Sequence, residues 1–173
     1  GILDALREAV DAAYEAGVIL VCAAGNIVNP VVAPARLSRT LAIGGVTRED
    51  RPWSGSSYGP QTDFSSYADG LRRANPVPGG RFEYAGGGDG TSYATAITSG
   101  TAALWLAHHG ADLDARYAQP WQRVEAFRSV LRASARVPPG WQPGAFGTGI
   151  VDVAAVLQAE LPPASALVRQ PPA

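Results

Sequence analysis

Residues 17–26, with the sequence GVILVCAAGN, carry the pattern that decides the fold. The stretch starts with the apolar run Val18 to Val21 and ends in the small residues Ala23-Ala24-Gly25-Asn26. A short run that is apolar on both faces is typical of a central strand in a parallel sheet. The stretch therefore predicts a strand covered on both sides, with Gly25 and Asn26 at its carboxyl end.

Helical and strand-like segments alternate around this strand. Residues 3–16 predict an amphipathic helix, because Leu3, Leu6, Val10 and Ala13 recur at spacings of three and four. A second apolar run at 40–46 predicts a second buried strand. This order predicts an α/β domain with a mostly parallel sheet.

The rest of the chain is rich in loops before it becomes helical again. We expect a loop-rich region at 47–90, short strands at 63–67 and 81–84, a sharp break at Gly86–Gly90, helices at 91–109, 119–135 and 153–161, and a turn and strand at 147–151. The helix at 91–109 is apolar or small nearly all round, which predicts a buried helix. Residues 1–160 are therefore expected to form the globular part, and the Pro-rich residues 161–173 a frayed end or linker.

Composition narrows the class of protein. The 173 residues include 46% hydrophobic and 17% charged residues, a balance typical of a globular chain. The formal net charge of −1 gives no electrostatic basis for binding nucleic acid or an anionic membrane. No apolar run approaches the roughly 18 residues that a membrane span needs. The sequence contains no Met, so we expect it to be a processed or excised part of a longer protein.

The single cysteine, Cys22, cannot form an internal disulfide. It lies inside an apolar run and has no basic neighbour in sequence that would lower its pKa. We interpret Cys22 as a small core residue and not as a catalytic thiol.

The segment Gly90-Thr91-Ser92-Tyr93-Ala94-Thr95 is the first candidate for chemistry. Ser92 follows a flexible glycine loop and begins a helix. The free N–H groups and the positive dipole end of a helix N-terminus stabilise developing negative charge, which suits a nucleophile whose attack creates an oxyanion. The alternative is that Thr91 or Ser92 only caps the helix.

Asn26 is the second candidate, because it follows a predicted parallel strand and lies 66 residues before Ser92. Ligand sites in parallel sheets form at the carboxyl ends of strands. A side-chain amide at that place can donate a hydrogen bond to an oxyanion. Gly-Asn alone is an ordinary turn, but the pair in this order and spacing is much more specific.

These segments resemble motifs of the subtilisin-like serine protease family, and the resemblance runs from about Ala5 to Leu157. Ala23 to Asn26 resembles the oxyanion-hole motif, and Gly90 to Ala94 resembles the nucleophile motif Gly-Thr-Ser-x-Ala. Further matches to the family pattern are Ala33-Pro34-Ala35, Thr40 to Val46, Ser54 to Asp63 and Gly147 to Asp152.

The resemblance implies a three-layer α/β/α fold whose N-terminal part is missing here, and a serine endopeptidase mechanism. Ser92 would attack the scissile carbonyl, and the Asn26 amide with the Ser92 backbone N–H would bind the oxyanion. The triad Asp and His are expected upstream of this chain. The implied partners are a protein or peptide substrate and the N-terminal part of the same catalytic domain, and the implied location is extracellular.

The resemblance implies no cofactor and no metal for catalysis. Structural calcium is common in the family, but no Asp-rich loop of the EF-hand type occurs in this sequence.

Substrate preference is also implied by the resemblance. Ala24 and Gly25 would line one wall of the pocket for the residue before the scissile bond, with Ile27 at the rim and Val32 near the floor. None of these residues is charged, so we expect a small or medium-sized apolar residue in the pocket. The Ala33–Pro34 bond is expected to be cis, as it is at this site in relatives.

The chain departs from the family pattern at several positions. Its two histidines, His108 and His109, lie at the far end of the helix that Ser92 begins, more than about 20 Å away at 1.5 Å per residue, and are expected to be surface residues. Ala96 replaces the usual proline after the nucleophile motif. Asp69 and Asp89 each precede a glycine, and we interpret both as solvated turn residues and not as triad substitutes.

Three alternatives stay open. An α/β-hydrolase has a similar nucleophile elbow, but it needs a His downstream of the Ser, and no His follows His109. A degenerate fold of the same family could bind without cutting, as a pseudoprotease. The chain could also be a structural half that depends on its N-terminal piece, because strands left unpaired would destabilise it alone.

Overall fold

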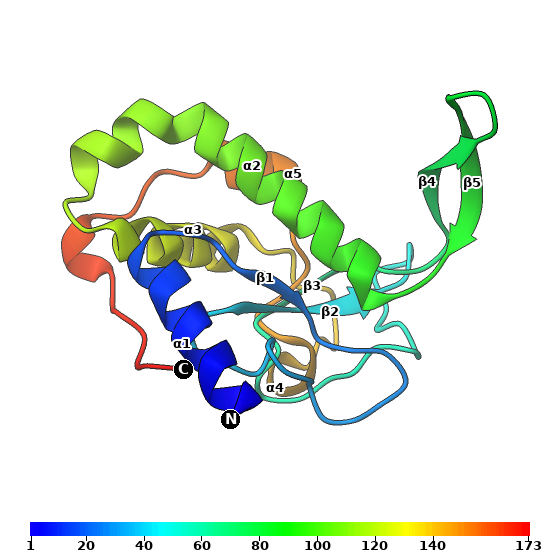
Figure 1. Cartoon of the computed structure of the whole chain (residues 1–173), viewed down its shortest axis with the longest axis horizontal. Helices are drawn as coiled ribbons and strands as arrows, with labels where there is room; N and C mark the ends of the chain where they lie inside the picture. The colour runs from blue at the N-terminus through cyan, green and yellow to red at the C-terminus, as the bar shows by residue number, and fades with distance from the viewer.

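A three-stranded parallel sheet lies at the centre of the computed structural model, which describes residues 1–173 (Figure 1). Its strands are β1 (Val21–Ala23), β2 (Leu41–Val46) and β3 (Phe64–Tyr67), in the spatial order β1-β2-β3. Both pairings are parallel, with Cys22 opposite Ala42 and Ile43 opposite Phe64. The predicted α/β class with a parallel sheet is confirmed.

The central strand β2 is completely buried. Since side chains alternate along a strand, Leu41 and Ile43 face one side of the sheet and Ala42 faces the other. Leu41 and Ile43 belong to the main hydrophobic core, and Ala42 belongs to a small second cluster with Ala24 and the segment 31–35. One face of the sheet therefore packs against the large hydrophobic core, which includes residues of the helices. The other face packs against the small cluster only.

The first strand differs from the prediction in position and in burial. It begins at Val21 instead of Val18, because the parallel pairing with β2 starts with the Leu41 N–H donating to the Leu20 carbonyl (2.8 Å). It lies at the edge of the sheet and its three residues are half-buried, so the prediction of a central strand is wrong for this chain. An edge strand has a neighbour on one side only, and Val18 before it is exposed.

Five helices and one short 3-10 turn complete the domain: α1 (Ile2–Glu15), α2 (Thr91–Arg116), α3 (Pro120–Ser134), α4 (Pro143–Phe146), α5 (Val153–Gln158) and η1 (Ala164–Ala166). The predicted helices at 3–16 and 119–135 are confirmed as α1 and α3, whereas α5 ends three residues before the predicted limit of 161. Helix α2 contacts all three strands, and α3 packs against α1 and α5. None of the helices combines the length and the apolar character that crossing a bilayer requires.

Helix α2 is longer and less buried than predicted. It continues to Arg116, and its buried face is made by Ala94, Thr98, Ala102 and Trp105, while Leu104 beside that face is exposed. Small residues on every face carry no amphipathic signal. The sequence therefore did not show which face meets water.

A β-hairpin leaves the body of the molecule just before α2 (Figure 1). Its strands are β4 (Leu71–Val77) and β5 (Arg81–Gly88), paired antiparallel. The sequence predicted a strand only at 81–84 and a break from Gly86. The break is instead at Asp89 and Gly90, because Gly86 to Gly88 still belong to β5. Strand β4 was missed because Pro76 and the polar residues beside it give no apolar alternation.

The predicted strand at 147–151 is reduced to single bridges. Ile150 pairs parallel with Ser65 of β3 and antiparallel with Arg136, without forming a ladder. Ile150 and then Arg136 thus lie beyond β3 at the edge of the sheet, but each bridge joins only one pair of residues.

The Pro-rich residues 161–173 do not form a frayed end or a free linker. The Gln170 N–H donates to Tyr14 Oη (3.0 Å), and the Arg39 guanidinium donates to the carbonyls of Gln170 and Pro171 (3.1 Å each). The Ala173 N–H donates to Asp11 of α1 (2.9 Å), and both termini lie beside that helix (Figure 1). Prolines lack the N–H donor, but the carbonyls of this segment still accept from side chains, which holds it on the body.

Candidate active site

Ser92 is the second residue of α2, and its side chain is exposed. The helix is capped by Gly90, whose φ of 144° is a conformation that favours glycine, and no side chain caps the helix. The alternative that Thr91 or Ser92 serves as a cap is therefore wrong. The Ser92 hydroxyl makes no hydrogen bond in the structure and lies among the free N–H groups of the first helical turn.

Asn26 follows β1, and its backbone is held by a neighbouring loop. The Ile27 N–H donates to the Gly55 carbonyl (2.7 Å), and the Ser57 N–H donates to the Gly25 carbonyl (2.8 Å). Asn26 pairs antiparallel with Ser56 between these two bonds. The loop after β1 is thus fixed on both sides of Asn26.

Thr91 orients the Asn26 side chain. The Thr91 backbone N–H donates to Asn26 Oδ1 (2.9 Å), and the Thr91 hydroxyl lies at 2.9 Å from the same oxygen. The hydroxyl also lies at 3.2 Å from the Gly25 carbonyl and accepts from the Gly25 N–H at 3.3 Å. Because the amide oxygen is engaged by Thr91, the Asn26 NH₂ group remains as a free donor.

Two hydrogen-bond donors meet beside Gly90. The position that a Cβ atom on Gly90 would take lies 3.3 Å from Asn26 Nδ2 and 3.8 Å from Ser92 N. The side-chain amide and the backbone N–H of the serine therefore surround one small space at the helix N-terminus. Two such donors, together with the helix dipole, can stabilise an oxyanion that forms next to the serine hydroxyl.

The residues predicted to line a substrate pocket are brought together only in part. Gly25 and Val32 are close, because a Cβ on Gly25 would lie 3.1 Å from Val32 Cγ1. Ala24 is fully buried beneath them, and Ile27 is 91% exposed with a φ of 69°. The structure places Gly25 and Val32 side by side and leaves Ile27 open to solvent. The predicted cis bond at Ala33–Pro34 is confirmed.

The two histidines cannot reach Ser92. His108 and His109 lie on the same continuous helix, 16 and 17 residues after Ser92, which places them about 24–26 Å away at 1.5 Å per residue. His108 is exposed as predicted, whereas His109 is half-buried with its ring 5.7 Å from that of Trp105. Burial, followed by the neighbouring His108, lowers the pKa of His109. Neither histidine of residues 1–173 can therefore act as the base for Ser92.

Two aspartates lie in the turns next to the hairpin, and only one of them makes a side-chain contact. Asp89 is exposed and accepts from the Gly70 N–H (2.8 Å), which closes the base of the hairpin. Asp69 lies in the turn between β3 and β4 and makes no hydrogen bond or ion pair. Asp89 was expected to be only solvated, and its bond to Gly70 was not evident from the sequence, because a contact across 19 residues leaves no local pattern.

Asp63 is the aspartate most strongly affected by burial, and it lies at the other end of the sheet. Its carboxylate accepts from the Ala42 N–H (2.8 Å) and from the Arg128 guanidinium (2.8 Å). Burial outweighs the Arg128 charge and raises the pKa of Asp63. Because Asp63 precedes β3 while Asn26 follows β1, this ion pair is separated from the candidate site by the length of the strands.

Cys22 lies on β1 and is half-buried against the small cluster that contains Ala24. Burial raises the pKa of its thiol, partly offset by a hydrogen bond with Thr40. A thiol with a raised pKa is protonated at neutral pH and is a poor nucleophile. The interpretation of Cys22 as a packing residue agrees with this environment.

No metal centre is built from the side chains of this chain. No group of three or more His, Cys, Asp or Glu side chains comes close enough together to hold a metal ion. We assign no metal ligands in this chain.

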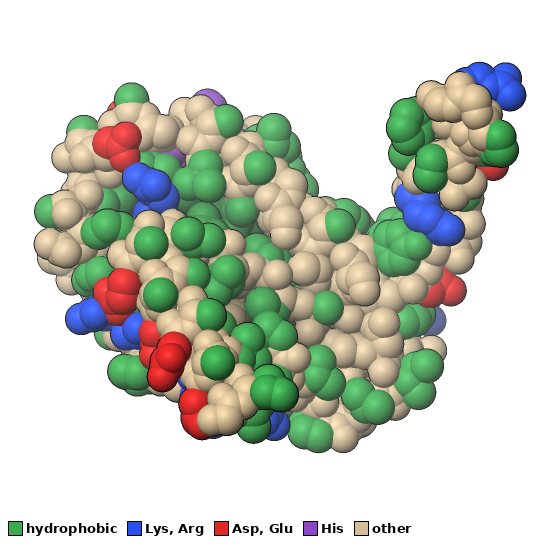
Figure 2. All heavy atoms as spheres, in the orientation of Figure 1, with side chains coloured by type: hydrophobic (Ala, Val, Ile, Leu, Met, Phe, Trp, Pro, Cys, Tyr) green, Lys and Arg blue, Asp and Glu red, His purple; other side chains and the backbone are tan.

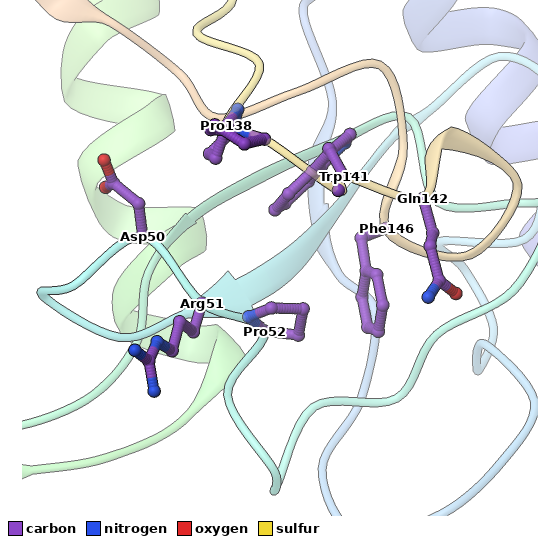
Figure 3. Close-up of a pocket in the computed structure, with 9 residues that line it drawn as sticks. Asp50, Arg51, Pro52, Pro138, Trp141, Gln142 and Phe146 are labelled. Atoms are coloured by element: carbon purple, nitrogen blue, oxygen red, sulfur yellow. The ribbon is translucent and has the colours of Figure 1, made fainter.

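A cavity of about 180 Å³ lies between the loops around Pro52 and Pro138 (Figure 3). Trp141 and Phe146 face it, but the Trp141 Nε1–H donates to the Gly147 carbonyl (2.8 Å) and is already satisfied. The cavity offers no nucleophile, and none of its lining residues belongs to the Ser92 and Asn26 region. We therefore place the candidate active site at the open N-terminus of α2 and not in this cavity.

Comparison with known proteins shows which family this chain is similar to. Residues 2–149 match the family model described as "Subtilase family". Subtilisin of Bacillus pumilus is 31% identical over 159 residues, covering 89% of this chain and 52% of that protein. The chain thus spans about half the length of this relative.

Solved structures show the same likeness. The self-cleaved protease domain of PatA is 26% identical with a TM-score of 0.66, covering 88% of this chain and 53% of that one. A lanthipeptide protease is 21% identical with a TM-score of 0.72, covering 90% and 54%, which is a likeness of fold alone.

Proposed function

Because this chain belongs to the subtilase family, a family of serine proteases, we propose that it supplies the nucleophile Ser92 and the oxyanion donor Asn26 of a serine endopeptidase. The observation that carries the proposal is the pair of contacts from Thr91 to Asn26 Oδ1, both at 2.9 Å. They direct the free amide N–H groups of Asn26 away from Thr91 and beside the Ser92 backbone N–H.

The proposed reaction is acyl transfer through a covalent intermediate. Ser92 Oγ attacks the scissile carbonyl carbon while a histidine removes the hydroxyl proton, and an aspartate orients that histidine. The oxyanion is bound by the Ser92 N–H and the Asn26 NH₂ until the peptide nitrogen leaves with the proton from histidine. Water then hydrolyses the acyl-serine. We place the histidine and the aspartate in a part of the protein outside residues 1–173.

The substrates we propose are proteins or peptides with a small or medium-sized apolar residue before the scissile bond. Gly25 and Val32 supply an uncharged wall beside the oxyanion donors, and Ala24 backs it from the core. No cofactor takes part in this chemistry. We further propose that the N-terminal part of the catalytic domain is the partner that completes the cleft, and that the protease acts outside the cell.

Labelling with a fluorophosphonate tests the proposal, because these probes react with a serine that a general base activates. The full-length protein that carries residues 1–173 is labelled, digested and mapped by mass spectrometry. We expect an adduct on Ser92 that the Ser92→Ala variant lacks. The Ser99→Ala variant is the matched control, since Ser99 is an exposed serine of the same helix and should leave labelling unchanged.

The opposite result has a definite meaning. A folded, mature protein without an adduct on Ser92 would contradict the protease proposal. The alternative of a pseudoprotease, which keeps the fold for binding without cutting, would then be favoured.

A further inference from the structure

The hairpin formed by β4 and β5 presents large apolar side chains to solvent. Phe82 is 73% exposed and Tyr84 is 77% exposed. Both lie on one face of β5, because they are two residues apart, and the cross-strand partners on that face are Pro76 and Ala74. Figure 2 shows the hairpin standing clear of the body, with hydrophobic and basic side chains gathered on it. An isolated apolar face of this kind marks an interaction site more often than a structural one.

The hairpin is also basic, in a chain whose formal net charge is −1. Residues 71–88 contain three arginines and one glutamate. The Arg72 guanidinium lies 5.6 Å from the centre of the Tyr84 ring, so a positive charge borders the aromatic face. Glu83 lies on the opposite face and accepts from Asn75 Nδ2 (3.3 Å). None of the three arginines forms an ion pair, which leaves the aromatic face with an uncompensated positive charge.

The base of the hairpin is attached directly to the candidate active site. Arg73 donates to the Tyr93 hydroxyl (3.1 Å), and Tyr93 follows Ser92. The Tyr93 ring packs on Gly88, where an added Cβ would clash with the Tyr93 hydroxyl. In Figure 1 the hairpin rises on one side of the α2 N-terminus, whereas the loop that follows β1 extends on the other side. The proposed acyl pocket of Gly25 and Val32 belongs to that loop.

A peptide lying across Ser92 therefore has its two ends in different surroundings. With the residue before the scissile bond beside Gly25 and Val32, the residues after the bond continue toward the hairpin. We propose that the face made by Arg72, Phe82 and Tyr84 is a docking surface for the substrate segment that follows the scissile bond. The chemistry of the face fits a segment in which an apolar side chain stands next to a carboxylate. This inference rests on the proposed function.

The distance of Tyr84 and Phe82 from the base of the hairpin decides how far the substrate must extend beyond the scissile bond to contact them. Tyr84 and Phe82 lie four and six residues along β5 from Gly88, or about 14 and 20 Å at 3.4 Å per residue. An extended substrate advances about 3.3 Å per residue. The face is thus reached by substrate residues about four to six positions beyond the scissile bond, whereas a shorter substrate does not contact it.

The experiment compares short and long substrates of the full-length protein. All share the same sequence up to a leucine before the scissile bond. One is a chromogenic anilide with no residue beyond the bond, and the others continue for six residues with Phe-Glu, Phe-Lys or Ser-Gln at the last two positions. They are assayed with the wild type, with the double variant Phe82→Ser and Tyr84→Ser, and with Arg72→Glu. Val168→Ser, which removes an exposed apolar side chain far from the hairpin, is the matched control.

We expect the wild type to cleave the Phe-Glu substrate with a kcat/KM about tenfold above that of the Ser-Gln substrate, because two aromatic rings are partly buried on binding. The double variant should lose this preference. The wild type should cleave Phe-Glu about threefold better than Phe-Lys, and Arg72→Glu should cleave Phe-Lys about threefold better than Phe-Glu. All variants should cleave the anilide as the wild type does, since none of the changed side chains reaches Ser92.

Several outcomes would overturn the inference. Equal rates for the three long substrates, or a preference that the double variant keeps, would remove the hairpin as a docking surface while leaving the protease function intact. Concentration-dependent dimers in sedimentation experiments, lost in the double variant, would assign the face to a second copy of the chain. No cleavage of the anilide together with no fluorophosphonate adduct would defeat both proposals.

Discussion

At the scale of single residues, Thr91 joins the two halves of the candidate site. Its backbone N–H and its hydroxyl both engage Asn26 Oδ1, and the hydroxyl also contacts the backbone of Gly25. The sequence pointed to Ser92 and Asn26 through motifs, but it suggested only a capping role for Thr91. The true role of Thr91 depends on a contact between residues 65 positions apart, which no local pattern reveals.

The first prediction concerns the Thr91 hydroxyl. Thr91→Val keeps the shape and the backbone N–H but removes one of the two bonds to Asn26, so the amide is oriented less firmly. We expect kcat of the full-length protein to fall about tenfold with little change in KM, as is typical when one hydrogen bond that orients a catalytic group is lost. Steady-state kinetics on the anilide substrate measures this. Thr101→Val, which removes a similar buried hydroxyl farther along α2, is the control, and an equal loss there would contradict the interpretation.

The second prediction concerns Asn26 itself. Asn26→Ala removes the amide that we propose as a donor to the transition state, so kcat should fall while KM stays nearly constant. The expected loss is about 10²–10³-fold, the size that removal of the oxyanion-hole asparagine has in subtilisin. The same kinetics checks it. A rise in KM with unchanged kcat would mean that Asn26 binds substrate but does not stabilise the oxyanion.

At the scale of elements, the parts with strong periodicity were predicted and the parts without it were not. Helix α3 and strand β2 have clear apolar patterns, and both lie where the sequence placed them. The exposed face of α2 and strand β4 were missed, because the first has small residues all round and the second contains Pro76. Strand β1 was placed at the centre of a sheet from its hydrophobicity alone. The apolar pattern of an element shows which of its residues avoid water. It does not show how many neighbouring strands or helices cover them.

We expect the hairpin to contribute little to the stability of the body. It pairs mainly with itself, and its aromatic face packs on nothing. Replacing residues 75–83 with a two-residue Asn-Gly turn should therefore change Tm by less than about 2 °C, since surface changes of this kind cost at most about 0.5 kcal/mol. Thermal unfolding followed by circular dichroism measures it. A drop of 5 °C or more would show that the hairpin supports the fold.

The C-terminal segment should behave in the opposite way. Removing residues 168–173 deletes the acceptors that Arg39 uses and the N–H that Gln170 donates to Tyr14. Loss of several partly buried hydrogen bonds costs about 2–3 kcal/mol, which lowers Tm by about 5–10 °C in a domain of this size. Arg169→Ser is the control, because it removes only a surface ion pair with Glu15. An unchanged Tm after truncation would restore the expectation of a free tail.

At the scale of the whole molecule, Tyr14 links three distant parts of the chain. It is fully buried in α1, its hydroxyl donates to Glu125 of α3 (3.0 Å), and it accepts from Gln170 of the C-terminal segment (3.0 Å). Burial is the largest cause that raises the pKa of Tyr14 to about 12, and the charge of Glu125 adds to it. The folded protein therefore holds this proton more tightly than the unfolded chain, whose tyrosine has a pKa of about 10.

This difference sets a pH dependence of stability. The contribution of Tyr14 is fully present below pH 10, and it decreases as pH rises from about 10 to about 12, because the unfolded state loses its proton first. Tyr14→Phe should be less stable than the wild type by about 1–3 kcal/mol at pH 8, and the gap should narrow across that window. Urea unfolding at a series of pH values measures the gap. Tyr58→Phe, on an exposed ring, should run parallel to the wild type, and a parallel curve for Tyr14→Phe would contradict the assignment.

The contact between Thr91 and Asn26 also sets the order in which parts of the chain can fold. It closes a loop of 65 residues, and contacts of such long sequence separation form after local helices, because the entropy of loop closure must be overcome first. Helix α2 can gain its hydrogen bonds early, while the oxyanion donors come together only when β1, β2 and β3 are in register. In a refolding time course, helical circular dichroism should therefore recover before Ser92 becomes reactive. The lag between the two signals would measure the slowest step of sheet assembly.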